Sequence, residues 1–123
     1  MKKILTLIFA VILLTLIFVT SPKQSFAACT AGPATNLTAT PTGNRGQVLL
    51  TWTPAMNGNM YHLVFGSMTN TYVMGALNVG GTGANNYTVN LLNPGQRYFF
   101  NIWSMCSTDG PATPSNEAVS ASQ

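Results

Sequence analysis

From residue 28 onwards the chain alternates apolar and polar residues in short runs, which turn-forming residues separate. Alternation over about four to eight residues is typical of a strand that is buried on one face. The runs predict strands at 48–52, 61–65, 71–74, 87–89, 98–106 and 117–120, after a short first strand that ends at Pro41. No amphipathic helical pattern interrupts them. The pattern therefore predicts an all-β protein, built as an antiparallel sandwich.

The stretch 92–102 combines a tight turn with the start of a strand. Pro94 sets φ at one corner of the turn, and Gly95 accepts the positive φ that follows. An apolar residue before such a turn and Tyr98 after it are typical of a tyrosine corner, whose hydroxyl bonds to backbone a few residues upstream. The core residues predicted for this region and the second strand are Leu92, Tyr98, Phe100, Ile102 and Trp52.

The N-terminus has the parts of a secretory signal peptide. A short basic start is followed by an apolar run over residues 4–19 and by small residues before a cleavage site after Ala27. We expect a signal peptide at 1–27 and a mature domain at 28–123, secreted or associated with the cell envelope. The alternatives are a membrane tether, either an uncleaved anchor at residues 4–19 or a lipid on Cys29.

Charge is scarce once the signal peptide is set aside. The mature part keeps two basic residues, Arg45 and Arg97, and two acidic ones, Asp109 and Glu117, so it has no net charge. Without a basic patch, binding to nucleic acid is not expected. The same neutrality gives little electrostatic protection against self-association.

The ionisable residues do not form a pattern that predicts catalysis. His62 is the only histidine, and it alternates outward from the apolar positions of its strand, which favours a solvated residue. A catalytic triad needs a nucleophile, a base and an orienting acid, but both acids lie near the C-terminus. Two cysteines and a distant histidine are also poorly spaced as zinc ligands. We expect a non-enzymatic protein without a metal or other cofactor.

The mature part contains two cysteines, Cys29 and Cys106. Export permits a disulfide, which would enclose nearly the whole domain. Two free thiols are the alternative.

Three motifs at this spacing resemble a fibronectin type III domain, over nearly all of the mature part. They are Val48-x-Leu50-x-Trp52-x-Pro54, Tyr61-x-Leu63-x-Phe65 and Leu92-x-Pro94-Gly95-x-x-Tyr98-x-Phe100-x-Ile102. The resemblance implies an immunoglobulin-like sandwich of seven strands, a fold that carries many functions. In the family the start of the first strand and the end of the sixth lie at the same pole, which implies a Cys29–Cys106 disulfide.

The outward-facing positions suggest a binding surface. If the alternate residues from Tyr98 point inward, the outward ones on the same strand include Phe99, Asn101, Trp103 and Met105, and the neighbouring edge adds Tyr72. An apolar row of this kind often marks a contact site, although neighbouring side chains can also cover it. The expected partner is a protein or a polysaccharide at the cell surface. A self-associating structural subunit of the envelope is the alternative.

Overall fold

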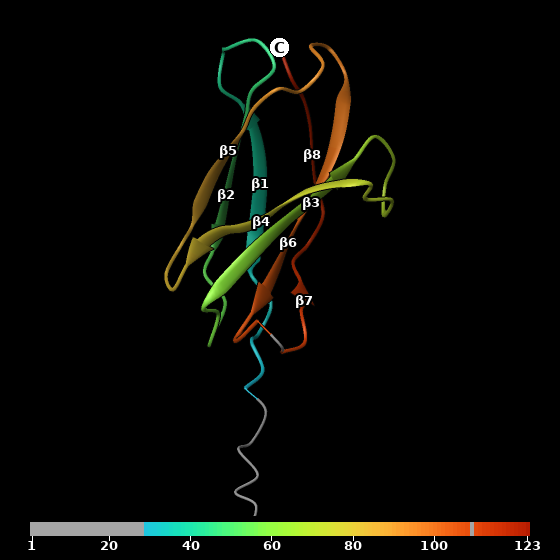
Figure 1. Cartoon of the computed structure of the whole chain (residues 1–123). Helices are drawn as coiled ribbons and strands as arrows, with labels where there is room; N and C mark the ends of the chain where they lie inside the picture. Colours follow the sequence, from blue (N-terminus) through green and yellow to red (C-terminus); the bar gives the residue numbers. More distant parts are fainter. Residues whose placement is uncertain (1–28, 109) are drawn as a thin grey trace, which may run out of the picture.

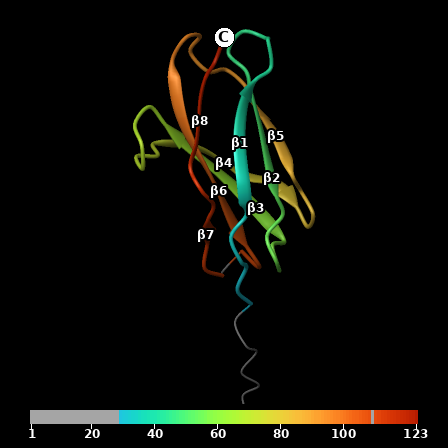
Figure 2. The same ribbon diagram turned by 180° about the vertical axis from the view of Figure 1, so that it is seen from behind.

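The computed structural model describes residues 29–108 and 110–123, which form two antiparallel sheets packed face to face (Figure 1; Figure 2 from behind). The predicted signal peptide, residues 1–27, lies outside this range. One sheet has the order β1-β2-β5, with β1 at Thr35–Pro41, β2 at Val48–Thr53 and β5 at Asn86–Val89. The other has the order β4-β3-β6-β7, with β8 also paired to β6. Its strands are β3 (Met60–Gly66), β4 (Met74–Gly81), β6 (Arg97–Met105), β7 (Thr113–Pro114) and β8 (Ala118–Ala121). The predicted sandwich is confirmed.

The closing strand predicted at 117–120 is present as β8, but a short strand that was not predicted, β7, precedes it, so that this side of β6 is covered by a strand broken in two. β7 pairs with the end of β6 (Trp103 with Pro114), and β8 pairs with its start (Phe100 with Ala118). Between them, the backbone N–H of Ser115 donates to the carbonyl of Ile102 at 2.8 Å, which holds the break against β6. The described residues therefore form eight strands, two of which occupy the place of the expected seventh.

The edge strand predicted at residues 71–74 is largely wrong. The apolar run there lies mostly in a connection, and the strand β4 begins at Met74 and continues to Gly81. β4 contains three glycines and an asparagine, which have low β propensity. It is a strand because β3 offers it a second pairing edge, on the side that β6 leaves free.

The core lies between the sheets, and the residues expected in it are there. Trp52, Leu92, Tyr98 and Phe100 are all buried. Phe65 is half-buried and stacks on Phe100 with ring centroids 5.7 Å apart. The remaining large core residues are Leu37, Val48, Leu50, Tyr61, Leu63, Val89 and Ile102.

The predicted tyrosine corner is also confirmed. The hydroxyl of Tyr98 accepts a hydrogen bond from the backbone N–H of Asn93 at 3.1 Å. Gly95 has the expected positive φ, 77°. The bond fixes the chain reversal before β6, the strand that pairs with β3, β7 and β8.

Substituting Tyr98→Phe removes this acceptor and leaves the Asn93 N–H unpaired. We expect the free energy of unfolding to fall by about 0.5–1.5 kcal/mol, the usual net contribution of a hydrogen bond, because Asn93 is exposed and its N–H remains open to water. Urea denaturation measures it. Tyr87→Phe, at a half-buried position on β5, is the matched control and should cost less. Equal losses in the two variants would contradict a special role for the corner.

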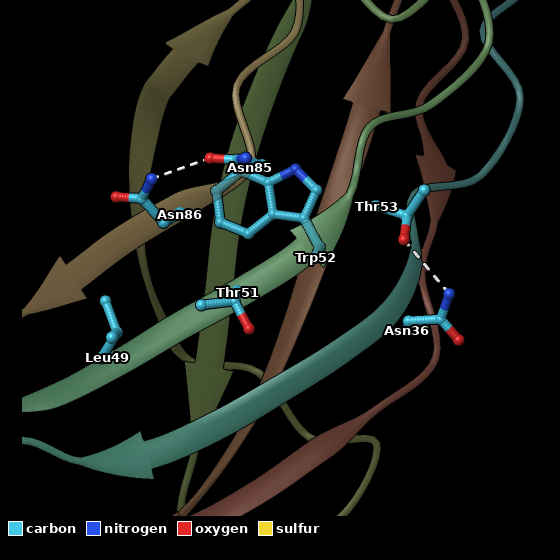
Figure 3. Close-up of a pocket in the computed structure, with 7 residues that line it drawn as sticks. All are labelled: Asn36, Leu49, Thr51, Trp52, Thr53, Asn85 and Asn86. Atoms are coloured by element: carbon cyan, nitrogen blue, oxygen red, sulfur yellow. Dashed lines mark hydrogen bonds between the residues drawn. The ribbon is translucent and has the colours of Figure 1, made fainter.

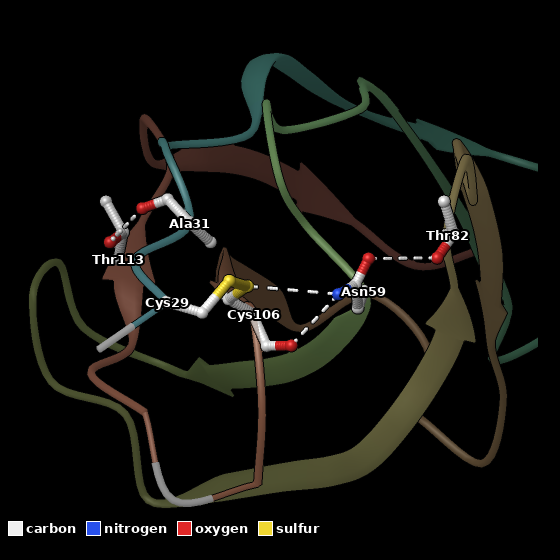
Figure 4. The surroundings of a disulfide bond; sticks show 6 residues. All are labelled: Cys29, Ala31, Asn59, Thr82, Cys106 and Thr113. Atoms are coloured by element: carbon white, nitrogen blue, oxygen red, sulfur yellow. Dashed lines mark hydrogen bonds between the residues drawn. A yellow bond between two sulfur atoms is a disulfide. The ribbon is translucent and has the colours of Figure 1, made fainter. Parts of the chain in front are cut away.

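Cys29 and Cys106 form a disulfide, with Cα atoms 5.6 Å apart, as the sequence resemblance implied (Figure 4). Asn59 supports it, because its Nδ2 donates to the Cys106 carbonyl at 3.0 Å. The Oγ1 of Thr113 donates to the Ala31 carbonyl at 2.9 Å, which also holds the incoming chain against β7. The start of the domain is thus joined to the end of β6. Within the described range, no helix is long and apolar enough to cross a membrane.

Candidate binding surface on the outer face of the second sheet

The outward residues of β6 differ in their exposure. Tyr98, Phe100 and Ile102 face the core, so the alternate positions point away from it, as predicted. Trp103 is 37% exposed, whereas Phe99 and Met105 are half-buried. The row is therefore partly covered, and Trp103 is its most open aromatic residue.

Asn101 is not an exposed polar neighbour of this row, and that prediction is wrong. The side chain is 6% exposed because the break between β7 and β8 lies over it. Its Nδ2 donates to the Ser115 carbonyl at 3.0 Å, and its Oδ1 accepts from the Ser115 N–H at 3.1 Å. Asn101 therefore fastens the broken closing strand to β6.

Phe99 lies away from Trp103. It is in register with Gly66 on β3 and with Val119 on β8, near the opposite end of β6. The two positions are four residues apart, about 13 Å along the strand, and the covered Asn101 lies between them. The two rings do not form one continuous platform.

Trp103 instead belongs to a shallow apolar hollow of about 570 Å³ between β6, β3 and β4. Tyr72 and Met105, which the sequence also proposed for binding, line the same hollow, and Phe99 and Asn101 do not. The full lining is His62, Leu63, Val64, Tyr72, Val73, Met74, Gly75, Ala76, Leu77, Trp103, Met105 and Ala112. Sequence reasoning missed the contribution of residues 75–77, because it ended the edge strand at Met74.

His62 shapes one wall of the hollow. It is paired across the strands with Trp103, and its Nδ1 accepts the backbone N–H of Asn78 at 2.9 Å. The pairing of β3 with β4 is irregular here, and Asn78 has a positive φ of 55°. Bulges of this kind re-aim side chains, and the adjacent Leu77 is 84% exposed. His62 thus lies on the outward face of β3, as predicted, where it is half-buried and hydrogen-bonded.

Glu117 organises the connection that leads into β4. Its carboxylate accepts hydrogen bonds from the Tyr72 hydroxyl at 2.6 Å, from the Asn70 N–H at 2.7 Å and from the Thr69 hydroxyl. Burial, followed by the bond to Glu117, raises the pKa of Tyr72 to about 12. Burial alone would raise the pKa of Glu117, but the three hydrogen bonds outweigh it and lower that pKa. Nothing in the sequence pattern connects Glu117 to residues about 45 positions earlier.

The pKa of Glu117 is lower in the folded protein than in the unfolded chain, so its carboxylate stabilises the fold at pH values above the usual carboxyl pKa. This contribution is lost as the pH falls through the lowered pKa. We therefore expect wild type to exceed Glu117→Gln in unfolding free energy at pH 7, with the difference shrinking towards about pH 3. Urea denaturation at both pH values measures it, and the other titrating groups are common to both proteins. A difference that does not change with pH would contradict the role given to this carboxylate.

A second hollow, of about 500 Å³, lies on the β1-β2-β5 sheet (Figure 3). Its polar groups are bonded to one another: Asn36 Nδ2 donates to Thr53 Oγ1 at 3.1 Å, and Asn86 Nδ2 donates to Asn85 Oδ1 at 2.8 Å. Trp52 contributes to its wall but is a core residue. The hollow around Trp103 is more apolar, and its exposed wall residues include large apolar side chains such as Val73 and Leu77, so it is the stronger candidate site. Among the described residues, no group of three His, Cys, Asp or Glu side chains lies close enough to hold a metal.

Comparison with known proteins identifies the fold. The chain is similar to a Fn3-like protein from Clostridium thermocellum, with 21% identity over 79% of this chain and 96% of that one, and a TM-score of 0.62. It is similar to an FN3 domain of human collagen XX, with 17% identity over 79% and 97% of the chains and a TM-score of 0.59. The FN5 domain of Drosophila Lar gives 17% identity over 75% and 96%, with a TM-score of 0.58. The fold is that of a fibronectin type III domain.

At these identities the likeness establishes the fold and leaves the function open. No protein-family model matches the chain, and no curated protein does. The function has to be argued from the surface itself.

Proposed function

We propose that the chain is a non-catalytic binding module, exported to the cell surface or beyond, which binds a protein through the hollow around Trp103. The observation that carries the proposal is the exposed apolar wall beside Trp103. Val73 is 75% exposed and Leu77 is 84% exposed, and both line the hollow. Exposed apolar patches of this kind often mark protein interfaces, and tryptophan is enriched among the residues that dominate them.

A protein partner is better supported than a polysaccharide. A sugar-binding platform would combine stacking rings with free polar groups beside them. Here Asn101 is covered, the Tyr72 hydroxyl is bound to Glu117, and Phe99 lies outside the hollow. The remaining lining is largely apolar and suits apolar side chains of a protein.

Photo-cross-linking in the host tests the proposal. A photoreactive phenylalanine analogue at Trp103 should give protein adducts, and the same analogue at the exposed Thr40, on the other sheet, should not. Adducts at neither or both positions would overturn the proposed site. Salt-insensitive retention of wild type, but not Trp103→Ala, on polysaccharide would assign the hollow to the other ligand class.

Export itself is tested by the intact mass of the protein from the medium and from the membrane fraction. We expect a species that begins at Ala28 and is lighter by two hydrogens than the reduced form. A lipid on Cys29 would use the sulfur that the structure bonds to Cys106, so the disulfide argues for a protein without that anchor. A membrane species that retains residues 4–19 would instead show a tethered form.

A further inference from the structure

One edge of the second sheet is open. In the described part of the chain β4 pairs with a single strand, β3, and no strand covers its other side (Figure 1). An edge strand presents a row of backbone N–H and C=O groups that can pair with another chain. Natural monomers protect such edges with charges, prolines, short strands, β-bulges or a covering segment.

The other edges of the sandwich carry these protections. The edge of β1 is covered by the side chain of Asn116. Its Oδ1 accepts from the backbone N–H of Leu37 at 2.9 Å, and its Nδ2 donates to the backbone carbonyl of Leu37 at 3.0 Å. β1 also ends at Pro41. β5 has four residues, and β7 has two, one of which is Pro114. By contrast, β4 has eight residues, and residues 71–83 contain neither a charge nor a proline. Its bulge lies at Asn78, and the stretch from Met74 to Ala76 pairs regularly with β3.

The surface beside the open edge is apolar. Val73, Met74 and Leu77 are all exposed, and the bulge at Asn78 holds Leu77 outward. These side chains also form the wall of the hollow that contains Trp103. A strand added to β4 would pair with the backbone edge, and its side chains would lie beside this wall.

Charge does not oppose the approach of an identical chain. The charged residues in the described range are Arg45 between β1 and β2, Arg97 at the start of β6, and Glu117 between β7 and β8. None lies on β3 or β4. A charged partner surface would lose hydration against the exposed side chains of Val73, Met74 and Leu77, whereas a second copy brings an equally uncharged, apolar wall.

We propose that two copies of this chain pair antiparallel along β4, about a two-fold axis, so that the exposed apolar wall of one Trp103 hollow meets that of the other. Antiparallel pairing of one strand with its own copy is self-complementary, because each contact occurs twice. The inference rests on the proposed function, since it names the protein that the hollow binds. It also agrees with the self-associating subunit that the neutral sequence allowed.

Sedimentation equilibrium of the protein in the form recovered from its host tests the pairing. We expect the apparent mass to rise with concentration towards twice the intact mass. Leu77→Lys should abolish the rise, because it places a charge at the open edge, and its high exposure predicts an unchanged fold. Thr40→Lys adds the same charge to β1 on the other sheet and should leave the rise intact.

Hydrogen exchange locates the contact. The backbone amides of β4 should gain protection as concentration increases, while those of β1 and β5 should not. A chain that stays monomeric at every concentration would overturn the inference. That result would leave the proposed function standing if the photoreactive phenylalanine analogue at position 103 still cross-linked a different protein. A dimer that persists in Leu77→Lys, or protection gained outside β4, would also overturn it.

Discussion

Phe100→Ala is expected to lower the free energy of unfolding by about 3–5 kcal/mol, the range for removing a buried phenylalanine from a core. Phe100 is fully buried, and it lies between the partners Phe65 on β3 and Ala118 on β8. The residues that would have to collapse into the cavity belong to two paired strands, so little relaxation is expected. Urea denaturation measures the loss.

Trp103→Ala on the same strand is the matched comparison, because it removes a larger side chain from a partly exposed position. It should cost clearly less than Phe100→Ala, although it removes more atoms. The result also decides whether the Trp103 variant can be used in binding assays. Equal losses would place Trp103 in the core and remove it from the proposed site.

Loss of the Cys29–Cys106 bond is expected to have an effect of similar size. The bond closes a loop with a sequence separation of 77, which corresponds to about 4–5 kcal/mol in the chain-entropy model. Small domains are stable by about 5–15 kcal/mol, so the double variant Cys29→Ala/Cys106→Ala should be near its unfolding limit at 37 °C. Urea denaturation with and without reductant measures the difference.

Reductant should destabilise the wild type by this amount and leave the double variant unchanged. If wild type has the same denaturation midpoint in both conditions, the bond contributes nothing to stability. A shift in the double variant would point to an effect of the reductant other than on this disulfide.

The fold could be predicted where burial on one face imposes strict alternation. In β2, β3 and β6 most of the inward positions predicted from the alternation are buried, among them Leu50, Leu63 and Phe100, and the turn at Pro94-Gly95 has the expected positive φ. β4 could not be predicted, because its glycines carry no periodic signal. Its existence depends on hydrogen bonds to β3, and a local pattern does not report such pairing.

The binding surface could be predicted only in part. The alternation of apolar and polar residues shows on which face of the sheet a side chain lies, but it does not show what covers that face. Asn101 is on the expected side of β6 and is buried by Ser115, which lies 14 residues later. Glu117 holds Tyr72 across 45 residues. Both contacts follow from the break in the closing strand, which no residue pattern marked.

The disulfide also sets how the domain carries mechanical load. Tension applied to the chain ahead of Cys29 passes through the sulfur bond directly into Cys106, at the end of β6, and bypasses the intervening strands. Forced unfolding between Cys29 and the C-terminus could then release only residues 107–123, about 60 Å of extended chain. Reduction would add the bypassed loop, about 270 Å for a separation of 77 residues. The same bond that stabilises the fold makes it a short, nearly inextensible link.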